Sequence, residues 1–222
     1  MSTRTNPPRD QGDPGGHALR RHWSWRPDWT RERRLWWWYL TFQGDDEVQR
    51  LAAEARAAIR PDAPVHAVPP PWLHLTLAEL GAVEAVPGPV LDKCARRARE
   101  HLADVGPVDL EVGPVSTLPG AVVLPVSASG LTQVYDGLVA ALHDELPQPP
   151  VQRRFDPHVS VAYVDRACRR ADVLDDEVVA AGEGGRSRTD RVSLVEVTRD
   201  QRHYRWTTRC DVSLRALRTA RR

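Results

Sequence analysis

Lysine, cysteine and long apolar runs are all scarce in this chain of 222 residues. Lys93 is the only lysine among 31 basic side chains, a bias that a GC-rich coding sequence explains. The three cysteines, Cys94, Cys168 and Cys210, are far apart and form no C-x-x-C pair, which predicts reduced thiols and neither a disulfide frame nor a zinc site. No segment approaches the roughly 18 consecutive apolar residues of a membrane span, and the N-terminus lacks the apolar stretch of a secretory signal. These absences predict a cytoplasmic protein without a membrane partner.

The motifs of several enzyme classes are also missing. The sequence has no G-x-x-x-x-G-K-[ST] loop for a nucleoside triphosphate, no G-x-S-x-G elbow and no H-E-x-x-H zinc motif. A formal net charge of +1 provides no strong overall field for a long nucleic acid. Its composition, 41% hydrophobic and 27% charged, is that of a globular protein.

The chain divides into a tail and one large domain. Residues 1–30 are rich in Arg, Pro, Gly and Asp, which predicts a flexible N-terminal tail. Trp23, Trp25 and Trp29 are unusual in such a tail, and the sequence leaves open whether they fold back onto the body. Residues 31–222 are expected to form a single domain.

Strand and helix patterns alternate along this domain without strict β-α-β order, which predicts an α+β fold. Residues 183–188, rich in glycine and arginine, are expected to form a mobile basic loop. The predicted strands are 35–42, 108–115, 121–126, 192–198 and 204–214, with a turn at 118–120, and the predicted helices are 48–59, 89–102, 131–146 and 170–181.

Two further strands carry the most informative feature, a histidine two residues before a hydroxyl side chain. His74-Leu75-Thr76-Leu77 and His158-Val159-Ser160-Val161 share this pattern. Positions i and i+2 of a strand point to one face, so each segment buries its apolar residues and presents an imidazole and a hydroxyl on the other side. Two such strands facing each other would surround one small space with acid–base groups. A third match, His22-Trp23-Ser24, is discounted because it lies in the predicted tail.

The paired motifs resemble those of the 2H phosphoesterases, which include 2′-5′ RNA ligases and RNA 2′,3′-cyclic phosphodiesterases. The resemblance covers about residues 35–214. It implies a bilobal α+β fold in which two antiparallel sheets flank a central cleft, with helices outside and one motif from each lobe. It also implies that neither a metal nor a nucleotide cofactor takes part. Two lobes related by a pseudo-twofold axis are a hypothesis that follows from the paired motifs.

These residues can open a 2′,3′-cyclic phosphate. His74 and His158 would act as general acid and base, in an order that the sequence does not give. Thr76 and Ser160 would donate hydrogen bonds to the phosphate oxygens as negative charge builds up. Run backwards, the same groups would join a cyclic phosphate to a 5′-hydroxyl without ATP, which is 2′-5′ RNA ligation.

Other residues are weaker candidates for substrate binding. Tyr39 or Trp72 could stack on a nucleobase, and a group near the last strands, Arg199, Arg202 and Tyr204, could bind a flanking phosphate. By strand parity, Tyr163 should point away from His158 and into the core.

Three functions remain open. The first is a cyclic phosphodiesterase, acting as a monomer on RNA with a 2′,3′-cyclic phosphate end or on a nucleotide. The second is the same chemistry on a small nucleotide such as ADP-ribose 1″,2″-cyclic phosphate, which the near-neutral charge favours because long RNA would call for a basic groove. The third is a non-catalytic module that binds RNA ends or nucleotides, although both histidines and both hydroxyls are present.

Overall fold

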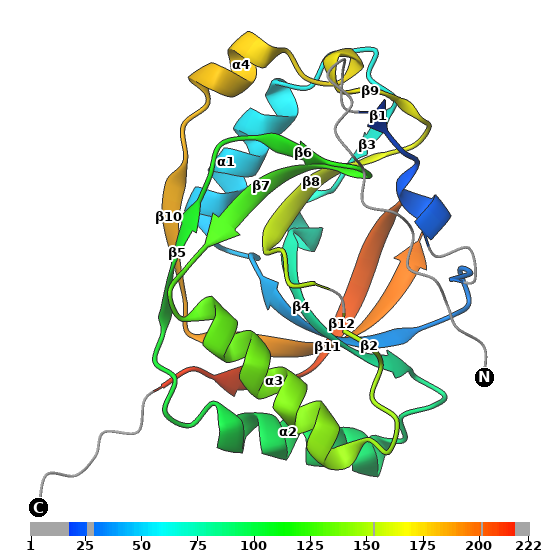
Figure 1. The fold of residues 1–222 in the computed structure, drawn as a ribbon, viewed down its shortest axis with the longest axis vertical. Helices are drawn as coiled ribbons and strands as arrows, with labels where there is room; N and C mark the ends of the chain where they lie inside the picture. Colours follow the sequence, from blue (N-terminus) through cyan, green and yellow to red (C-terminus); the bar gives the residue numbers. More distant parts are fainter. Residues whose placement is uncertain (1–17, 26–28, 153, 201, 216–222) are drawn as a thin grey trace, which may run out of the picture.

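The computed structural model describes residues 18–25, 29–152, 154–200 and 202–215. It consists of helices and antiparallel strands, as the sequence predicts (Figure 1). The strands are β1 Ala18–Leu19, β2 Leu35–Thr41, β3 Val65–Ala67, β4 His74–Ala82, β5 Val108–Val112, β6 Ser116–Leu118, β7 Ala121–Ser127, β8 His158–Val164, β9 Cys168–Arg169, β10 Gly185–Thr189, β11 Arg191–Asp200 and β12 His203–Ser213. The α-helices are α1 Asp46–Ala57, α2 Gly88–His101, α3 Leu131–Glu145 and α4 Asp176–Ala181, and short 3-10 turns lie at His22–Trp25, Pro70–Trp72 and Arg170–Asp172.

Ten strands form one strongly curled sheet in the order β10-β5-β7-β8-β4-β2-β11-β12, with β3 paired to β8 and β6 to β7. Every pair is antiparallel. The upper half in Figure 1 ends with β8 and the lower half begins with β4. These two strands, which carry the paired motifs, are joined by a single residue pair, Leu75 with Val159. The two expected sheets are therefore halves of one sheet that meet at the motifs.

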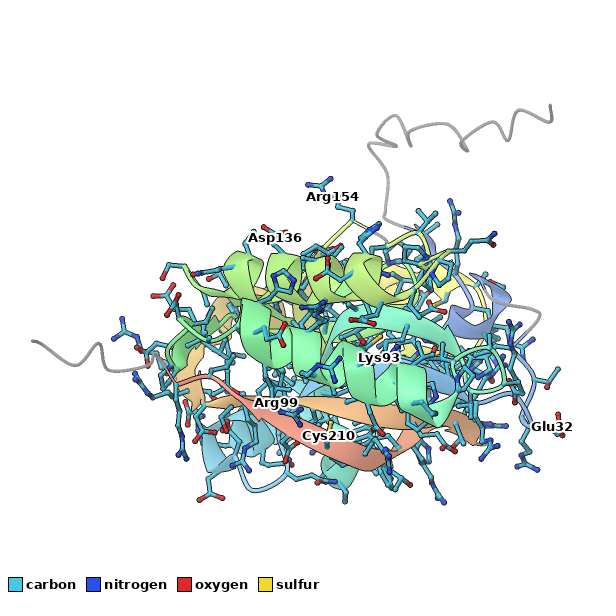
Figure 2. The ribbon with its side chains drawn as sticks, turned by 90° about the horizontal axis from the view of Figure 1, so that it is seen from below. Glu32, Lys93, Arg99, Asp136, Arg154 and Cys210 are labelled. Atoms are coloured by element: carbon cyan, nitrogen blue, oxygen red, sulfur yellow. The ribbon has the colours of Figure 1, made fainter. Side chains whose placement is uncertain are left out.

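The helices cover the outside of each half. Asp45 caps α1 by accepting a hydrogen bond from the backbone N–H of Val48, and the apolar face of α1 packs on the upper half. Helices α2 and α3 pack side by side beneath the lower half. Figure 2 shows their order from below, with Asp136 on α3, Lys93 and Arg99 on α2, and Cys210 of β12 next to Arg99.

Several predicted elements differ from the structure. The helix expected over 170–181 is broken, because Val173 and Leu174 turn inward and are fully buried before Asp175 caps the short α4. The prediction of a mobile loop over 183–188 is wrong, because residues 185–189 form β10 and pair with the open edge of β5. A Cβ atom on Gly184 would lie 2.5 Å from the carbonyl oxygen of Val112, so the close approach to β5 requires glycine there.

The strand expected over 108–115 also ends early, at Val112. The expected turn at 118–120 joins the extra strand β6 to β7.

The described part of the predicted tail packs on the body. Strand β1 pairs with β9, and Trp23 and Trp29 are buried. The side chain of Trp25 lies outside the described residues, as do residues 1–17 and 26–28 of the predicted tail.

Candidate active site

Pairing between the two motif strands brings four predicted site residues to one face of the sheet. Leu75 and Val159 lie opposite each other and are fully buried on the helix side. Because neighbouring side chains alternate in direction, the residues on either side of this pair point the other way, toward the concave face. His74 then lies diagonally across from His158, and each histidine lies next to the hydroxyl residue of the other strand. Those four residues, His74, Thr76, His158 and Ser160, line one cavity.

Each motif ends in a β-bulge. The pairing of β2 with β4 runs from Tyr39–Thr76 to Trp38–Ala78 and so skips Leu77. The pairing of β7 with β8 runs from Val123–Ser160 to Val122–Ala162 and so skips Val161. The skipped residue is the apolar fourth residue in both motifs, and each bulge reverses the face to which the following side chains point.

The bulge in β8 corrects the prediction for Tyr163. Simple alternation assigns this side chain to the face opposite His158, but the extra residue Val161 restores it to the same face. Tyr163 lines the cavity together with His158 and Ser160. This tyrosine is a cavity residue that sequence parity missed.

Both catalytic candidates are held in the same way through Nδ1. Nδ1 of His74 lies 2.9 Å from the carbonyl oxygen of Trp72, and Nδ1 of His158 lies 2.6 Å from that of Asp156. A carbonyl oxygen only accepts, so Nδ1 is the donor in each ring. The other nitrogen, Nε2, is therefore the one that can exchange a proton with a ligand in the cavity.

The surroundings of the two imidazoles differ. His74 is only 7% exposed, stacks on Tyr39 with ring centroids 4.2 Å apart, and meets the edge of Trp206 at 5.1 Å. Burial lowers the pKa of His74 to about 4, against a smaller opposing effect of the hydrogen bond to Trp72. His158 is less buried. At neutral pH, His74 is therefore neutral and can accept a proton.

Each motif hydroxyl shares a hydrogen bond with a tyrosine, Thr76 with Tyr39 and Ser160 with Tyr163. Burial raises the pKa of both phenols well above their usual range, so both keep their proton. A hydroxyl can both donate and accept, so each pair holds the Thr76 or Ser160 oxygen beside its phenol on the cavity wall.

The cavity has a volume of about 590 Å³ and a lining that suits an anion. No acidic side chain is found among the described residues that line it. The lining consists of Arg20, Arg21, His22, Ser24, Trp29, Trp37, Tyr39, His74, Thr76, Leu118, Pro119, Gly120, Ala121, His158, Ser160, Tyr163 and Tyr204. Within the described ranges, no group of three or more His, Cys, Asp and Glu side chains is arranged to hold a metal ion.

The discounted third match contributes a histidine to this cavity. His22 lies 2.9 Å from the hydroxyl of Tyr204 through Nε2, and its ring packs on Tyr163 with centroids 4.1 Å apart. Burial is the main cause that lowers the pKa of His22 to about 3. The signals in the sequence were the third match itself and the dense run of tryptophans around this histidine.

The weaker candidates divide into two groups. Tyr39 and Tyr204 line the cavity. Trp72, Arg199 and Arg202 do not, so the geometry gives no support to their expected contacts with substrate. Trp72 packs against Trp206, Arg199 holds the N-terminal segment through the carbonyl of Trp29, and Arg202 contacts His66.

Comparison with protein families settles the relationship. The model of the 2′-5′ RNA ligase superfamily matches residues 40–201, which include both motifs. The chain belongs to the 2′-5′ RNA ligase superfamily. Membership supports an activity of the phosphodiesterase or ligase type, and it confirms the family that the paired motifs indicate. No curated protein sequence matches the chain.

Solved structures of other proteins share the fold of this chain at low sequence identity. TT0787 of Thermus thermophilus is 20% identical with a TM-score of 0.67, and the alignment covers 82% of this chain and 98% of that chain. LigT of E. coli, in complex with NADP+, is 16% identical with a TM-score of 0.62 over 82% and 99% of the two chains. The likeness confirms the predicted fold. The described helices include none that is both long and apolar enough to cross a membrane.

Proposed function

We propose that this protein is a phosphodiesterase that opens 2′,3′-cyclic phosphate ends of RNA or nucleotides. The observation that carries the proposal is the arrangement of two imidazoles, each held through Nδ1, and two hydroxyls around one cavity. A general acid, a general base and donors to the phosphate oxygens are the groups that such a hydrolysis requires.

The difference in burial supports separate roles for the two histidines. His74 is neutral at pH 7 because it is buried and because a charge on His158 further disfavours its protonation. Two imidazoles around one cavity carry one proton more easily than two. His74 is therefore the general base, which leaves the role of general acid to His158.

The hydrolysis then proceeds in one step. Nε2 of His74 removes a proton from a water molecule as the water oxygen forms a bond to phosphorus. The bond between phosphorus and one ribose oxygen breaks, and Nε2 of His158 gives its proton to that oxygen. The product is a phosphate monoester next to a free hydroxyl, and proton exchange with solvent restores both rings.

Thr76 and Ser160 stabilise the charge that develops on the phosphate oxygens. Each donor of this kind contributes about 3 kcal/mol to lowering the barrier. Tyr39 and Tyr163 position these hydroxyls through the hydrogen bonds described above.

Nucleotides are the substrate class that the surroundings favour. Aromatic side chains of Trp37, Tyr39 and Tyr204 in the lining provide apolar surface for a base, and the cationic lining suits phosphate. LigT of E. coli has been crystallised with 3′-AMP and with phosphate, which is consistent with this class. In reverse, the same groups would join a cyclic phosphate to a 5′-hydroxyl.

The test is hydrolysis of a 2′,3′-cyclic mononucleotide and of a cyclic-phosphate-ended RNA by wild type, His74→Ala and His158→Ala. Each variant should lose about 100- to 10,000-fold in turnover. His143→Ala, an exposed histidine on α3 outside the cavity, is the matched control and should retain full activity.

Turnover by either variant at the wild-type rate would refute the two-histidine mechanism. A wild-type protein that binds these nucleotides without hydrolysing them would instead be a binding module.

A further inference from the structure

The N-terminal strap, residues 18–25, runs between the two halves of the sheet (Figure 1). Four of its residues, Arg20, Arg21, His22 and Ser24, line the cavity. On the upper half, β1 pairs with β9, and the backbone N–H of Arg20 donates to the carbonyl of Pro119 in the turn between β6 and β7. On the lower half, His22 reaches the hydroxyl of Tyr204 on β12. The family match begins at residue 40, so the strap is outside the matched region.

Aromatic packing fixes the strap in place. The Trp23 ring lies 5.3 Å from Tyr163 of the upper half and 5.3 Å from Tyr204 of the lower half. Trp29, which lies beyond the strap, also stacks on Tyr204, with ring centroids 5.0 Å apart. The Arg199 guanidinium lies 4.5 Å over the Trp23 ring and donates to the carbonyl of Trp29. Because both halves hold it, the strap is a wall of the cavity.

The strap contributes two basic side chains to the cavity. Arg20 and Arg21 are exposed and line the cavity, although neither belongs to the two motifs. Within the described ranges, the guanidinium of Arg21 forms no hydrogen bond or ion pair, and no acidic side chain lines the cavity beside it. A guanidinium in this setting matches a phosphate, whose oxygens it can bind in bidentate fashion.

We propose that Arg21 and the strap form a subsite for a second phosphate group, which restricts the enzyme to small nucleotides that carry a phosphate besides the reacting one. This inference rests on the proposed function, because the first phosphate is the one held between the motifs. A cavity of about 590 Å³ is of the size that holds one small ligand. Because the strap is a wall of the cavity, it limits how far a ligand can extend on that side.

Calorimetric binding tests the subsite without any turnover. The probes are adenosine 2′-phosphate, adenosine 2′,5′-bisphosphate and a dinucleotide with the same terminal 2′-phosphate. Wild type should bind the bisphosphate about 10-fold more tightly than the monophosphate. Arg21→Ala should abolish this preference, while Arg21→Lys should retain part of it.

The matched control is Arg186→Ala, which removes the same charge from an exposed position on β10 outside the cavity. It should keep the wild-type preference. Equal affinity of wild type for both adenosine phosphates would overturn the proposal, as would equal losses in Arg21→Ala and Arg186→Ala.

Two outcomes separate this inference from the proposed function. If the dinucleotide gains as much affinity as the bisphosphate, the second phosphate belongs to an RNA chain and the restriction to small substrates is wrong. If the wild type hydrolyses no cyclic phosphate but shows the Arg21-dependent preference, the phosphodiesterase proposal fails while the subsite stands.

Discussion

Protonation of His22 should weaken the folded state as the pH falls. This imidazole is largely buried between Tyr163 and Tyr204, and burial lowers its pKa from 6.5 to about 3. Positive charges on Arg199, His158 and His74 act in the same direction, and a hydrogen bond to the Gly120 backbone opposes them. In the unfolded chain the same ring titrates near 6.5.

The sign and size of the effect follow from this difference. Between pH 6.5 and 3 the unfolded state binds a proton that the folded state does not bind, so stability is lost as the pH falls through this range. A pH of 4 lies about 2.5 pH units below the unfolded pKa, and each unit corresponds to roughly 1.4 kcal/mol. His22 alone should therefore cost about 3 kcal/mol between pH 7 and pH 4.

Urea unfolding followed by tryptophan fluorescence, at pH 7 and pH 4, measures this loss. His22→Gln removes the titration while keeping an amide that can bond to Tyr204. The variant should be less stable than wild type at pH 7. The difference between their free energies of unfolding should be about 3 kcal/mol smaller at pH 4. His143→Gln, on the exposed face of α3, corrects for the acid sensitivity of the rest of the chain. A gap between wild type and His22→Gln that does not change with pH would refute the reasoning.

Three further outcomes are expected. Because the pKa of His74 is about 4, kcat/KM plotted against pH should fall on the acidic side near pH 4. A fall near pH 6.5 would contradict the assignment of His74 as the general base. Tyr163→Phe should lower kcat about 10-fold by releasing the Ser160 hydroxyl, while Tyr135→Phe on α3 should leave kcat unchanged. Equal kcat values for the two variants would contradict the role of Tyr163 in positioning Ser160. Gly120→Ala would put a Cβ atom 3.2 Å from the Cα and Nδ1 of His22 and should lower the urea midpoint by an amount equivalent to about 1 kcal/mol, which an unchanged midpoint would disprove.

Local periodicity explains what the sequence could predict. Alternation of apolar and polar residues around His74 and His158 shows that imidazole and hydroxyl share one face, because the strand pleat has a period of two. The caps and amphipathic patterns of α1, α2 and α3 are likewise local, so these helices lie within a residue or two of their predicted bounds.

Features that depend on distant partners could not be predicted. The bulge at Val161 is defined by pairing with β7, and without it Tyr163 is assigned to the wrong face. Strand β10 exists because β5 has an open edge, which residues 183–188 do not reveal. His22 reaches the cavity through contacts with Tyr163 and Tyr204, more than 100 positions along the chain.

The two motifs are nearly equivalent in backbone, and their neighbours make them chemically different. Each has its second residue in the Leu75–Val159 pair, its fourth residue at a bulge, and its histidine held through Nδ1 by a carbonyl two residues earlier. If the surroundings of the two imidazoles were also equivalent, neither histidine would be favoured as the general base. Other strands of the lower half break this symmetry, since Tyr39 of β2 and Trp206 of β12 enclose His74 and keep it neutral. The lower half of the sheet therefore contributes the proposed base, and the sequence of β2 and β12, outside the motif itself, determines its role.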